Sequence, residues 1–183
     1  MALMYSKGMA VGTAMPHFEL PGVDKRAYTP EDFSDAKILV VVFTCNHCPY
    51  AIASEDRLIQ IQNDYRDRGV RFVLINSNDA ERYPADSFIM MEERAKEKKY
   101  PFPYLHDETQ KVARTYDAAC TPDIFVFDKD RKLRYNGRID DNWQEPHNVT
   151  QHDLRIVLDD LLAGRDISID AVPSMGCSIK WKV

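Results

Sequence analysis

Fully apolar runs alternate along this chain with stretches in which apolar residues recur at helical spacing. Residues 38–43, Ile-Leu-Val-Val-Val-Phe, are apolar at every position, which is typical of a central strand buried on both faces. The residues after Cys48 follow a helical pattern to about Arg68, and Gly69 marks its end. A second, mostly apolar stretch at 70–75 predicts another buried strand.

Shorter elements are expected in the rest of the chain, which contains no internal repeat or linker. They comprise helices at 84–99, 109–116 and 153–162, a strand at 123–127 and its hairpin partner at 133–139. Residues 1–30 predict a hairpin-like β extension, and residues 165–183 predict an irregular C-terminal tail. A parallel strand–helix–strand unit that leads into an antiparallel hairpin predicts one α/β domain over residues 1–183, with a mixed central sheet between helices.

Composition and charge exclude several classes of function. Of the 183 residues, 44% are hydrophobic and 29% are charged, and the net charge is −5, which is the balance of an ordinary globular protein. No stretch approaches the roughly 18 apolar residues of a membrane helix, and the basic footprint of a nucleic-acid binder is missing. The first residues do not form a basic region that leads into an apolar run. We therefore expect a cytoplasmic protein that binds neither membrane nor nucleic acid.

The chain has four cysteines, at positions 45, 48, 120 and 177, and at least two of them need a chemical explanation, because structural disulfides are rare in the cytoplasm. Cys45 and Cys48 form a Cys-Asn-His-Cys motif between the first buried strand and the helix after it. A helix N-terminus favours a thiolate, and the two-residue spacer lets the second thiol resolve a mixed disulfide. The alternatives are an inert pair or half of a zinc site, but zinc sites usually carry a second pair about 15–20 residues away. The motif therefore predicts a redox pair.

Other residues in or near this motif have two interpretations each. His47 either stabilises a thiolate of the motif as a cation or is an exposed spacer residue, and both interpretations stay open. Thr121-Pro122 is either a cis peptide that faces the motif or an ordinary proline at the entry to an edge strand or turn. Cys120 and Cys177 are candidate auxiliary redox thiols or small buried hydrophobic residues.

The chain resembles the peroxiredoxin-like branch of the thioredoxin superfamily, in which an AhpC/TSA-like redoxin domain carries a Cys-x-x-Cys motif. The resemblance rests on the segments 16–20, 43–50, 76–79 with Pro84, 101–105, 116–123, 135–141 and 173–182. It implies the thioredoxin fold with an N-terminal β extension. It also implies that Pro122 is a cis-proline next to the motif.

Departures from the family patterns bear on the activity. The peroxidatic cysteine of peroxiredoxins matches Cys48, but Cys45 replaces the usual Thr, Val41 the usual Pro and Pro122 the Arg that polarises peroxide. Without these groups, a fast peroxidase lacks its preorganised electrostatic stabilisation. Compared with thioredoxin, Thr44 replaces the Trp before the first cysteine.

Together, these features predict a thiol–disulfide oxidoreductase. In this interpretation Cys45 is the attacking, more exposed thiolate, Cys48 is the resolving thiol, Thr121 and Pro122 shape the substrate groove, and His47 tunes the thiolate. No bound cofactor or metal is expected, and a thioredoxin-type or glutathione-type dithiol reductant supplies electrons for a disulfide or peroxide substrate. The alternatives are a slow thiol peroxidase that uses Cys48, and a non-catalytic thiol or Cu(I)-binding module.

Overall fold

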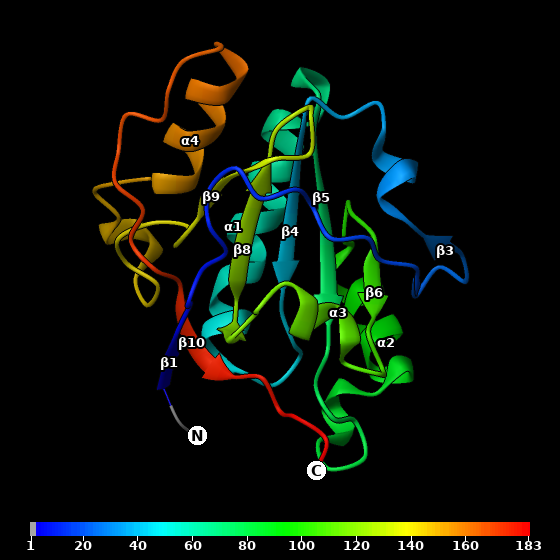
Figure 1. Cartoon of the computed structure of the whole chain (residues 1–183). Coiled ribbons are helices and arrows are strands. Elements are labelled where there is room, and N and C mark those ends of the chain that lie inside the picture. Colours follow the sequence, from blue (N-terminus) through cyan, green and yellow to red (C-terminus); the bar gives the residue numbers. More distant parts are fainter. Residues whose placement is uncertain (1–2) are drawn as a thin grey trace.

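Five strands form the central sheet in the order β6-β5-β4-β8-β9 (Figure 1). The computed structural model describes residues 3–183. β4 lies at the centre, parallel to β5 and antiparallel to β8. The strands of this sheet are β4 (Ile38–Phe43), β5 (Val70–Asn76), β6 (Tyr104–His106), β8 (Asp123–Phe127) and β9 (Leu133–Asn136). The mixed sheet predicted from the sequence is confirmed, because a parallel unit does lead into an antiparallel hairpin.

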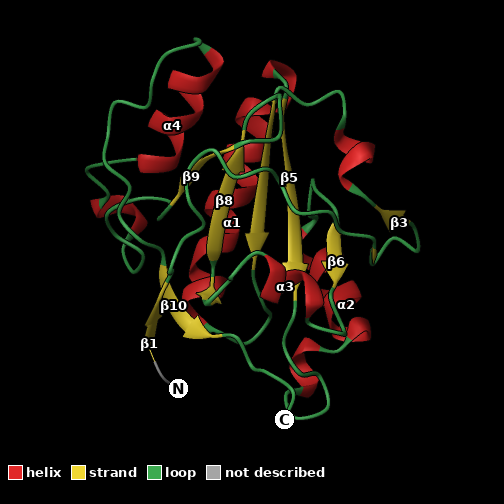
Figure 2. Ribbon diagram, in the orientation of Figure 1, coloured by secondary structure: helices red, strands yellow, loops and turns green. Residues whose placement is uncertain are grey.

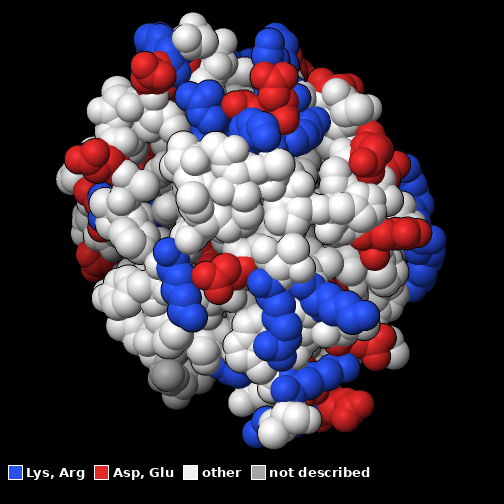
Figure 3. All heavy atoms as spheres, in the orientation of Figure 1, with Lys and Arg blue, Asp and Glu red and all other residues white. Residues whose placement is uncertain are grey.

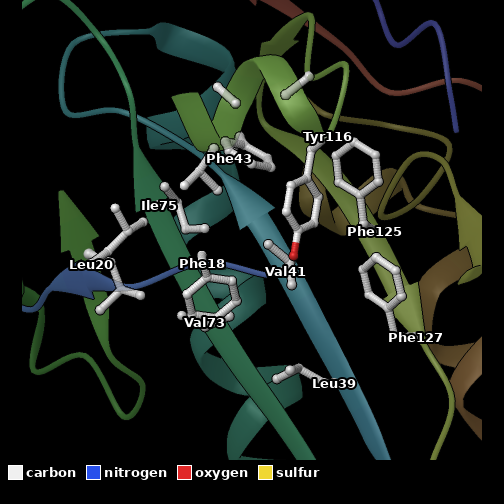
Figure 4. Close-up of a cluster of buried hydrophobic side chains, with 14 of the residues drawn as sticks. Phe18, Leu20, Leu39, Val41, Phe43, Val73, Ile75, Tyr116, Phe125 and Phe127 are labelled. Atoms are coloured by element: carbon white, nitrogen blue, oxygen red, sulfur yellow. The ribbon is translucent and has the colours of Figure 1, made fainter. Parts of the chain in front are cut away.

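The side chains of β4 alternate between two hydrophobic cores, one on each face of the sheet. Leu39, Val41 and Phe43 point into a core that contains Phe18 and an edge-to-face cluster of aromatic rings around Tyr116 (Figure 4). The intervening residues of β4 point into the second core. All six residues are buried, which explains why the run carries no polar position.

Three helices cover the second core, and the third helix in chain order lies on the opposite face (Figure 2). The helices are α1 (Pro49–Tyr65), α2 (Phe88–Lys98), α3 (Lys111–Thr115) and α4 (Asp153–Leu162), with short 3-10 turns at Pro30–Phe33, Arg66–Arg68, Pro84–Asp86 and Pro146–Asn148. No helix within residues 3–183 is long and apolar enough to span a membrane. Charged side chains of both signs surround a broad uncharged area on the face in Figure 3.

The strands predicted at 38–43 and 123–127 and the helix at 153–162 are confirmed, whereas three other boundaries differ. The helix expected at 84–99 is broken at Ser87, because Asp86 turns inward to accept hydrogen bonds from other loops. The helix expected from 109 starts at 111, since Gln110 is left-handed with φ of 62°. The hairpin partner expected at 133–139 ends at Asn136.

The C-terminal tail is not irregular throughout, and this expectation is wrong for four residues. Met175–Ser178 forms β10, which lies between β1 (Leu3–Tyr5) and β7 (Cys120–Thr121) in a second, antiparallel sheet. Met-Gly-Cys-Ser has no strand pattern of its own, so the strand exists because it has a partner on each side. A further hairpin, β2 (Leu20–Pro21) with β3 (Ala27–Tyr28), confirms the expected N-terminal β extension.

Candidate active site

The two cysteines of the motif lie where β4 ends and α1 begins. Cys48 is the N-cap residue of α1 with an extended backbone, and Pro49 occupies the first turn, where a missing N–H costs nothing. Cys45 lies in the loop before it. The two residues are 2% and 0% exposed, and all four cysteines, which lie within the described residues, are thiols. The difference in exposure that we expected between Cys45 and Cys48 is therefore absent.

The environment of Cys48 favours the thiolate. A hydrogen bond from the Cys45 thiol is the largest influence and lowers the pKa of Cys48 to about 4, although burial acts in the opposite direction. The Cys177 thiol, the backbone N–H of Ala51 and Thr121 also donate hydrogen bonds to it. The N–H of Ala51 is one of the unpaired donors at the start of α1, which an N-cap sulfur can accept.

The surroundings of Cys45 favour the thiol. Its hydrogen bond to Cys48, its burial and the nearby carboxylate of Asp86 raise the pKa of Cys45 well above the usual value. The directions of the two shifts favour Cys48 over Cys45 as the thiolate, which differs from our expectation. The largest cause of both shifts is the interaction between the two thiols themselves.

Thr121 faces both sulfur atoms. Its hydroxyl Oγ1 lies 3.3 Å from the sulfur of Cys45, and its carbonyl oxygen accepts a hydrogen bond from the Cys48 thiol at 3.3 Å. The Thr121–Pro122 peptide bond is cis, as the resemblance implied. Thr44 is buried at the end of β4, and its N–H donates to the carbonyl of Ile75 at 2.8 Å.

His47 is held by a buried carboxylate. Its Nδ1 lies 2.6 Å from Oδ2 of Asp86, and its ring stacks on Tyr83 with 5.2 Å between ring centroids. Asp86 also accepts hydrogen bonds from the N–H of Asn46 and from the side-chain amides of Asn76 and Asn78. Burial alone raises the pKa of Asp86, but the bonds from His47 and its other donors outweigh it and lower the pKa.

Sequence reasoning missed Asp86. No local pattern marks it, because its partners come from two other segments of the chain, residues 46–47 and 76–78. Cys45, His47 and Asp86 place donor atoms within 4.8 Å of one another, a set that could hold a metal ion. Both carboxylate oxygens of Asp86 are already engaged as acceptors, so metal binding requires that hydrogen bonds of this network be broken.

The structure treats the two auxiliary cysteines differently. Cys177 on β10 packs against Cys45, Cys48 and Ala51. Burial and then the hydrogen bond to Cys48 raise the pKa of Cys177 to about 12. Cys120 is fully buried, its sulfur lies 3.5 Å from the carbonyl oxygen of Pro122, and burial raises its pKa strongly. Of these two cysteines, only Cys177 therefore packs against the cysteines of the motif.

A cavity lies beside the cis-proline and is lined by Pro122 and Met175, each one or two residues from a residue that contacts the thiols. It has a volume of about 240 Å³ and is also lined by Tyr50 and Trp143, whose rings lie 4.0 Å apart. The loop that carries Trp143 is tied to α1 by Arg57, which donates to Asp140, Asn142 and Trp143. The cavity therefore has a rigid aromatic wall beside the cis-proline.

This fold, with a buried thiol pair at a helix N-terminus facing a cis-proline, defines a redox protein of the thioredoxin superfamily. Residues 10–154 match the Redoxin family, and the chain belongs to that family. The resemblance to the redoxin branch is thereby confirmed.

Two solved structures are similar to the chain over nearly its whole length. An uncharacterised conserved protein from Geobacillus kaustophilus is 47% identical, with 100% of this chain and 97% of that chain covered and a TM-score of 0.94. A hypothetical protein from Sinorhizobium meliloti is 38% identical, with 98% of each chain covered and a TM-score of 0.93.

More distant structures share the fold alone. The peroxidoxin BcpB from Mycobacterium tuberculosis is 17% identical, with 85% of this chain and 95% of that chain covered and a TM-score of 0.60. No match was found among the curated proteins compared.

Proposed function

We propose that this protein is a thiol–disulfide oxidoreductase that cycles Cys45 and Cys48 between the dithiol and the disulfide. The observation that carries the proposal is the packing of Cys45 against Cys48 at the N-terminus of α1, where the surroundings lower the pKa of Cys48 and raise the pKa of Cys45. A thiolate is the species that attacks a disulfide. The neighbouring thiol is ready to resolve the product.

The first step forms a mixed disulfide on Cys48. The Cys48 thiolate attacks one sulfur of the substrate disulfide, the substrate S–S bond breaks, and the other substrate sulfur leaves as a thiolate that takes up a proton. The negative charge on Cys48 disappears in this step. Since the hydrogen bond to Cys48 is the largest influence that raises the pKa of Cys45, the Cys45 thiol becomes easier to ionise once the mixed disulfide exists.

The second step releases the reduced substrate. Cys45 loses its proton and attacks the sulfur of Cys48, so that the Cys45–Cys48 disulfide forms and the second substrate thiolate leaves. Donor atoms of His47 and Asp86 lie within 4.8 Å of the Cys45 sulfur, and in this proposal these groups take up the proton. A dithiol of the thioredoxin type, or two molecules of a monothiol of the glutathione type, then supplies the two electrons that restore both thiols.

Thr121 and Pro122 shape the entrance for the substrate in this proposal. Their backbone borders both sulfurs, and the cavity with Tyr50 and Trp143 begins at Pro122. A rigid, mostly apolar wall suits an apolar group next to the substrate disulfide. Because both sulfurs are buried, bulk water does not reach the reacting atoms.

A second candidate is a thiol peroxidase that uses Cys48, because Cys48 stands at the position of the peroxidatic cysteine of peroxiredoxins. The groups that donate hydrogen bonds to Cys48 are thiols, a hydroxyl and a backbone N–H, and all of them are uncharged. No guanidinium is among these donors to stabilise the charge that develops on a peroxide. We therefore place peroxide turnover below disulfide exchange in rate.

Parallel kinetics test the order of the two activities. Single-turnover rates are measured with a disulfide substrate and with hydrogen peroxide for the wild type, Cys45→Ser and Cys48→Ser. We expect Cys48→Ser to abolish both reactions. Cys45→Ser should stop at a mixed disulfide with the disulfide substrate. A peroxide reaction of wild type that outpaces disulfide exchange would reverse the order, and a Cys48→Ser variant that keeps full exchange activity would refute the proposed nucleophile.

A further inference from the structure

The C-terminal strand brings a third thiol to the Cys45–Cys48 pair. β10 lies between β1 and β7, and its residue Cys177 is paired directly with Thr121. Cys177 is 3% exposed and packs with Cys45, Cys48 and Ala51 in one cluster. More than 120 positions of sequence separate Cys177 from Cys48, so the contact is made by the fold alone.

The register of β10 decides which auxiliary cysteine meets the motif. Directly paired residues of neighbouring strands place their side chains on the same face, and Thr121 faces the motif with a hydroxyl 3.3 Å from the sulfur of Cys45. Cys177, its partner, therefore faces the motif as well. Cys120 is paired with Ser178, one position further along, and consecutive strand residues point to opposite faces.

Gly176 allows this close approach. A Cβ atom added at Gly176 would lie 2.0 Å from the carbonyl oxygen of Thr121, a distance at which the backbone itself must move. The absence of a side chain at this position therefore lets β10 press against the segment that carries Thr121 and Pro122. The sulfur of Cys177 is held within hydrogen-bonding reach of the Cys48 thiolate as a result.

We propose that Cys177 is a third redox thiol, so that Cys48 forms a disulfide either with Cys45 or with Cys177. This rests on the proposed function in one respect, namely that Cys48 is the reacting thiolate. Cys48 is the central sulfur, because both Cys45 and Cys177 donate hydrogen bonds to it. The second disulfide fastens the C-terminal strand to the N-terminus of α1 and leaves Cys45 as a thiol.

The exchange between the two disulfides is balanced without any added oxidant. Cys177 loses its proton and attacks the sulfur of Cys48 in the Cys45–Cys48 disulfide. The bond between Cys45 and Cys48 breaks, the bond between Cys48 and Cys177 forms, and Cys45 leaves as a thiolate that takes up the proton. The number of oxidised sulfurs is unchanged. The Cys48 charge that disfavours ionisation of Cys177 is absent when Cys48 is part of a disulfide.

The test uses the full chain with Cys45→Ser, in which only the second disulfide can form on Cys48 within one molecule. The protein is oxidised with one equivalent of diamide, which accepts the two electrons and two protons of the thiol pair. Remaining thiols are alkylated, and the digest is analysed by mass spectrometry for linked peptides. We expect a peptide pair that joins Cys48 to Cys177, in a monomer on a non-reducing gel, and its loss after treatment with dithiothreitol.

Two double variants provide matched controls. Cys45→Ser with Cys120→Ser should keep the Cys48–Cys177 link, and Cys45→Ser with Cys177→Ser should lose it. Urea unfolding of each variant before oxidation confirms that it is folded. If Cys48 of folded Cys45→Ser ends instead as a diamide adduct or an intermolecular dimer while Cys177 is alkylated, the proposal is overturned.

The wild type separates this proposal from the proposed function. A wild-type Cys45–Cys48 disulfide without a Cys48–Cys177 link in Cys45→Ser refutes the third thiol alone. A wild type in which Cys48 takes part in no disulfide at all refutes the function. We also expect a measurable fraction of the Cys48–Cys177 form in oxidised wild type, and that fraction should vanish in Cys177→Ser.

Discussion

The proton shared by Cys45 and Cys48 determines which sulfur is the nucleophile, and the position of each residue relative to α1 determines where that proton lies. Cys48 is the N-cap residue of α1, and its pKa is lowered. Cys45 lies three residues earlier, beside the carboxylate of Asp86, which disfavours a second negative charge. The same motif would have the opposite order of roles if the helix began three residues earlier.

Removing the thiol of Cys45 should therefore make Cys48 a weaker acid. A hydrogen bond to a charged group is worth about 1.5–3 kcal/mol, which corresponds to about 1–2 pKa units. In reduced Cys45→Ala we expect the pKa of Cys48 to rise by that amount from the value of about 4 in the wild type. The ultraviolet absorbance of the thiolate, followed against pH, measures it. Cys120→Ala is the matched control and should leave the titration unchanged.

Asp86 should be among the residues whose loss destabilises the molecule most. It is fully buried and accepts hydrogen bonds from several loop groups, and each buried donor left without its partner costs about 1–3 kcal/mol. We expect a loss of at least that size in urea unfolding of Asp86→Ala at neutral pH. Asp56→Ala, which removes an 81% exposed carboxylate paired with Lys98, should change stability by only about 0.5 kcal/mol.

The pH dependence of this contribution follows from the direction of the shift. The pKa of Asp86 is lower in the folded state than its usual value, so the carboxylate stabilises the fold fully above the unfolded pKa of about 3.9. The contribution is lost as the pH falls below that value and Asp86 becomes protonated. A gap between wild type and Asp86→Ala that stayed constant down to the acid transition would contradict a buried, ionised Asp86.

At the level of elements, the sequence predicts those whose pattern is complete within one segment. The runs at 38–43 and 123–127 are recognisable because both faces of each strand are buried. β10 could not be predicted, because Met-Gly-Cys-Ser becomes a strand only between β1 and β7. The site divides in the same way: Cys45 and Cys48 are local signals, whereas their contacts with Asp86 and Cys177 depend on segments that meet only in the folded chain.

Gly176→Ala tests how closely β10 is packed. The added methyl group would meet the carbonyl oxygen of Thr121, and overpacking of this kind costs about 1–3 kcal/mol. We expect a loss of that size in urea unfolding, together with less Cys48–Cys177 disulfide in the Cys45→Ser background. Ser178→Ala on the same strand, where no such contact arises, should remain within about 0.5 kcal/mol of wild type. A Gly176→Ala protein as stable as wild type would mean that β10 is free to shift.

At the scale of the whole molecule, the site lies at the edge of the central sheet where β4 ends. β4 and β5 are parallel, so their carboxyl ends lie at the same edge. β4 leads into the motif, and β5 leads into the loop that carries Asp86. β1 and β10 come from distant parts of the sequence and pair with each other, and β10 also pairs with the strand that carries Thr121. Because the site joins segments from the whole chain, its protonation state is coupled to the stability of the whole fold.

Reduced wild type should therefore gain stability relative to Cys48→Ser as the pH rises from about 5 to about 8. The pKa of Cys48 is about 4 in the folded protein and about 8.5 in an unfolded chain. Between these values the unfolded state binds one more proton, so the gain is at most about 1.4 kcal/mol per pH unit. It is complete above the unfolded pKa and is lost as the pH falls toward the folded one. Above about pH 8.5 the raised pKa of Cys45 acts in the opposite sense.

Urea unfolding of reduced wild type and reduced Cys48→Ser at several pH values, each with dithiothreitol, measures this difference. Oxidised wild type is the matched control, because its Cys45–Cys48 disulfide has no thiol to ionise and should show no such slope relative to oxidised Cys120→Ser. Reduced Cys120→Ser should parallel reduced wild type, since burial raises the pKa of Cys120 and keeps it protonated over this range. A difference between wild type and Cys48→Ser that does not change with pH would show that Cys48 keeps its proton in the folded state. The attacking thiolate would then have to be Cys45.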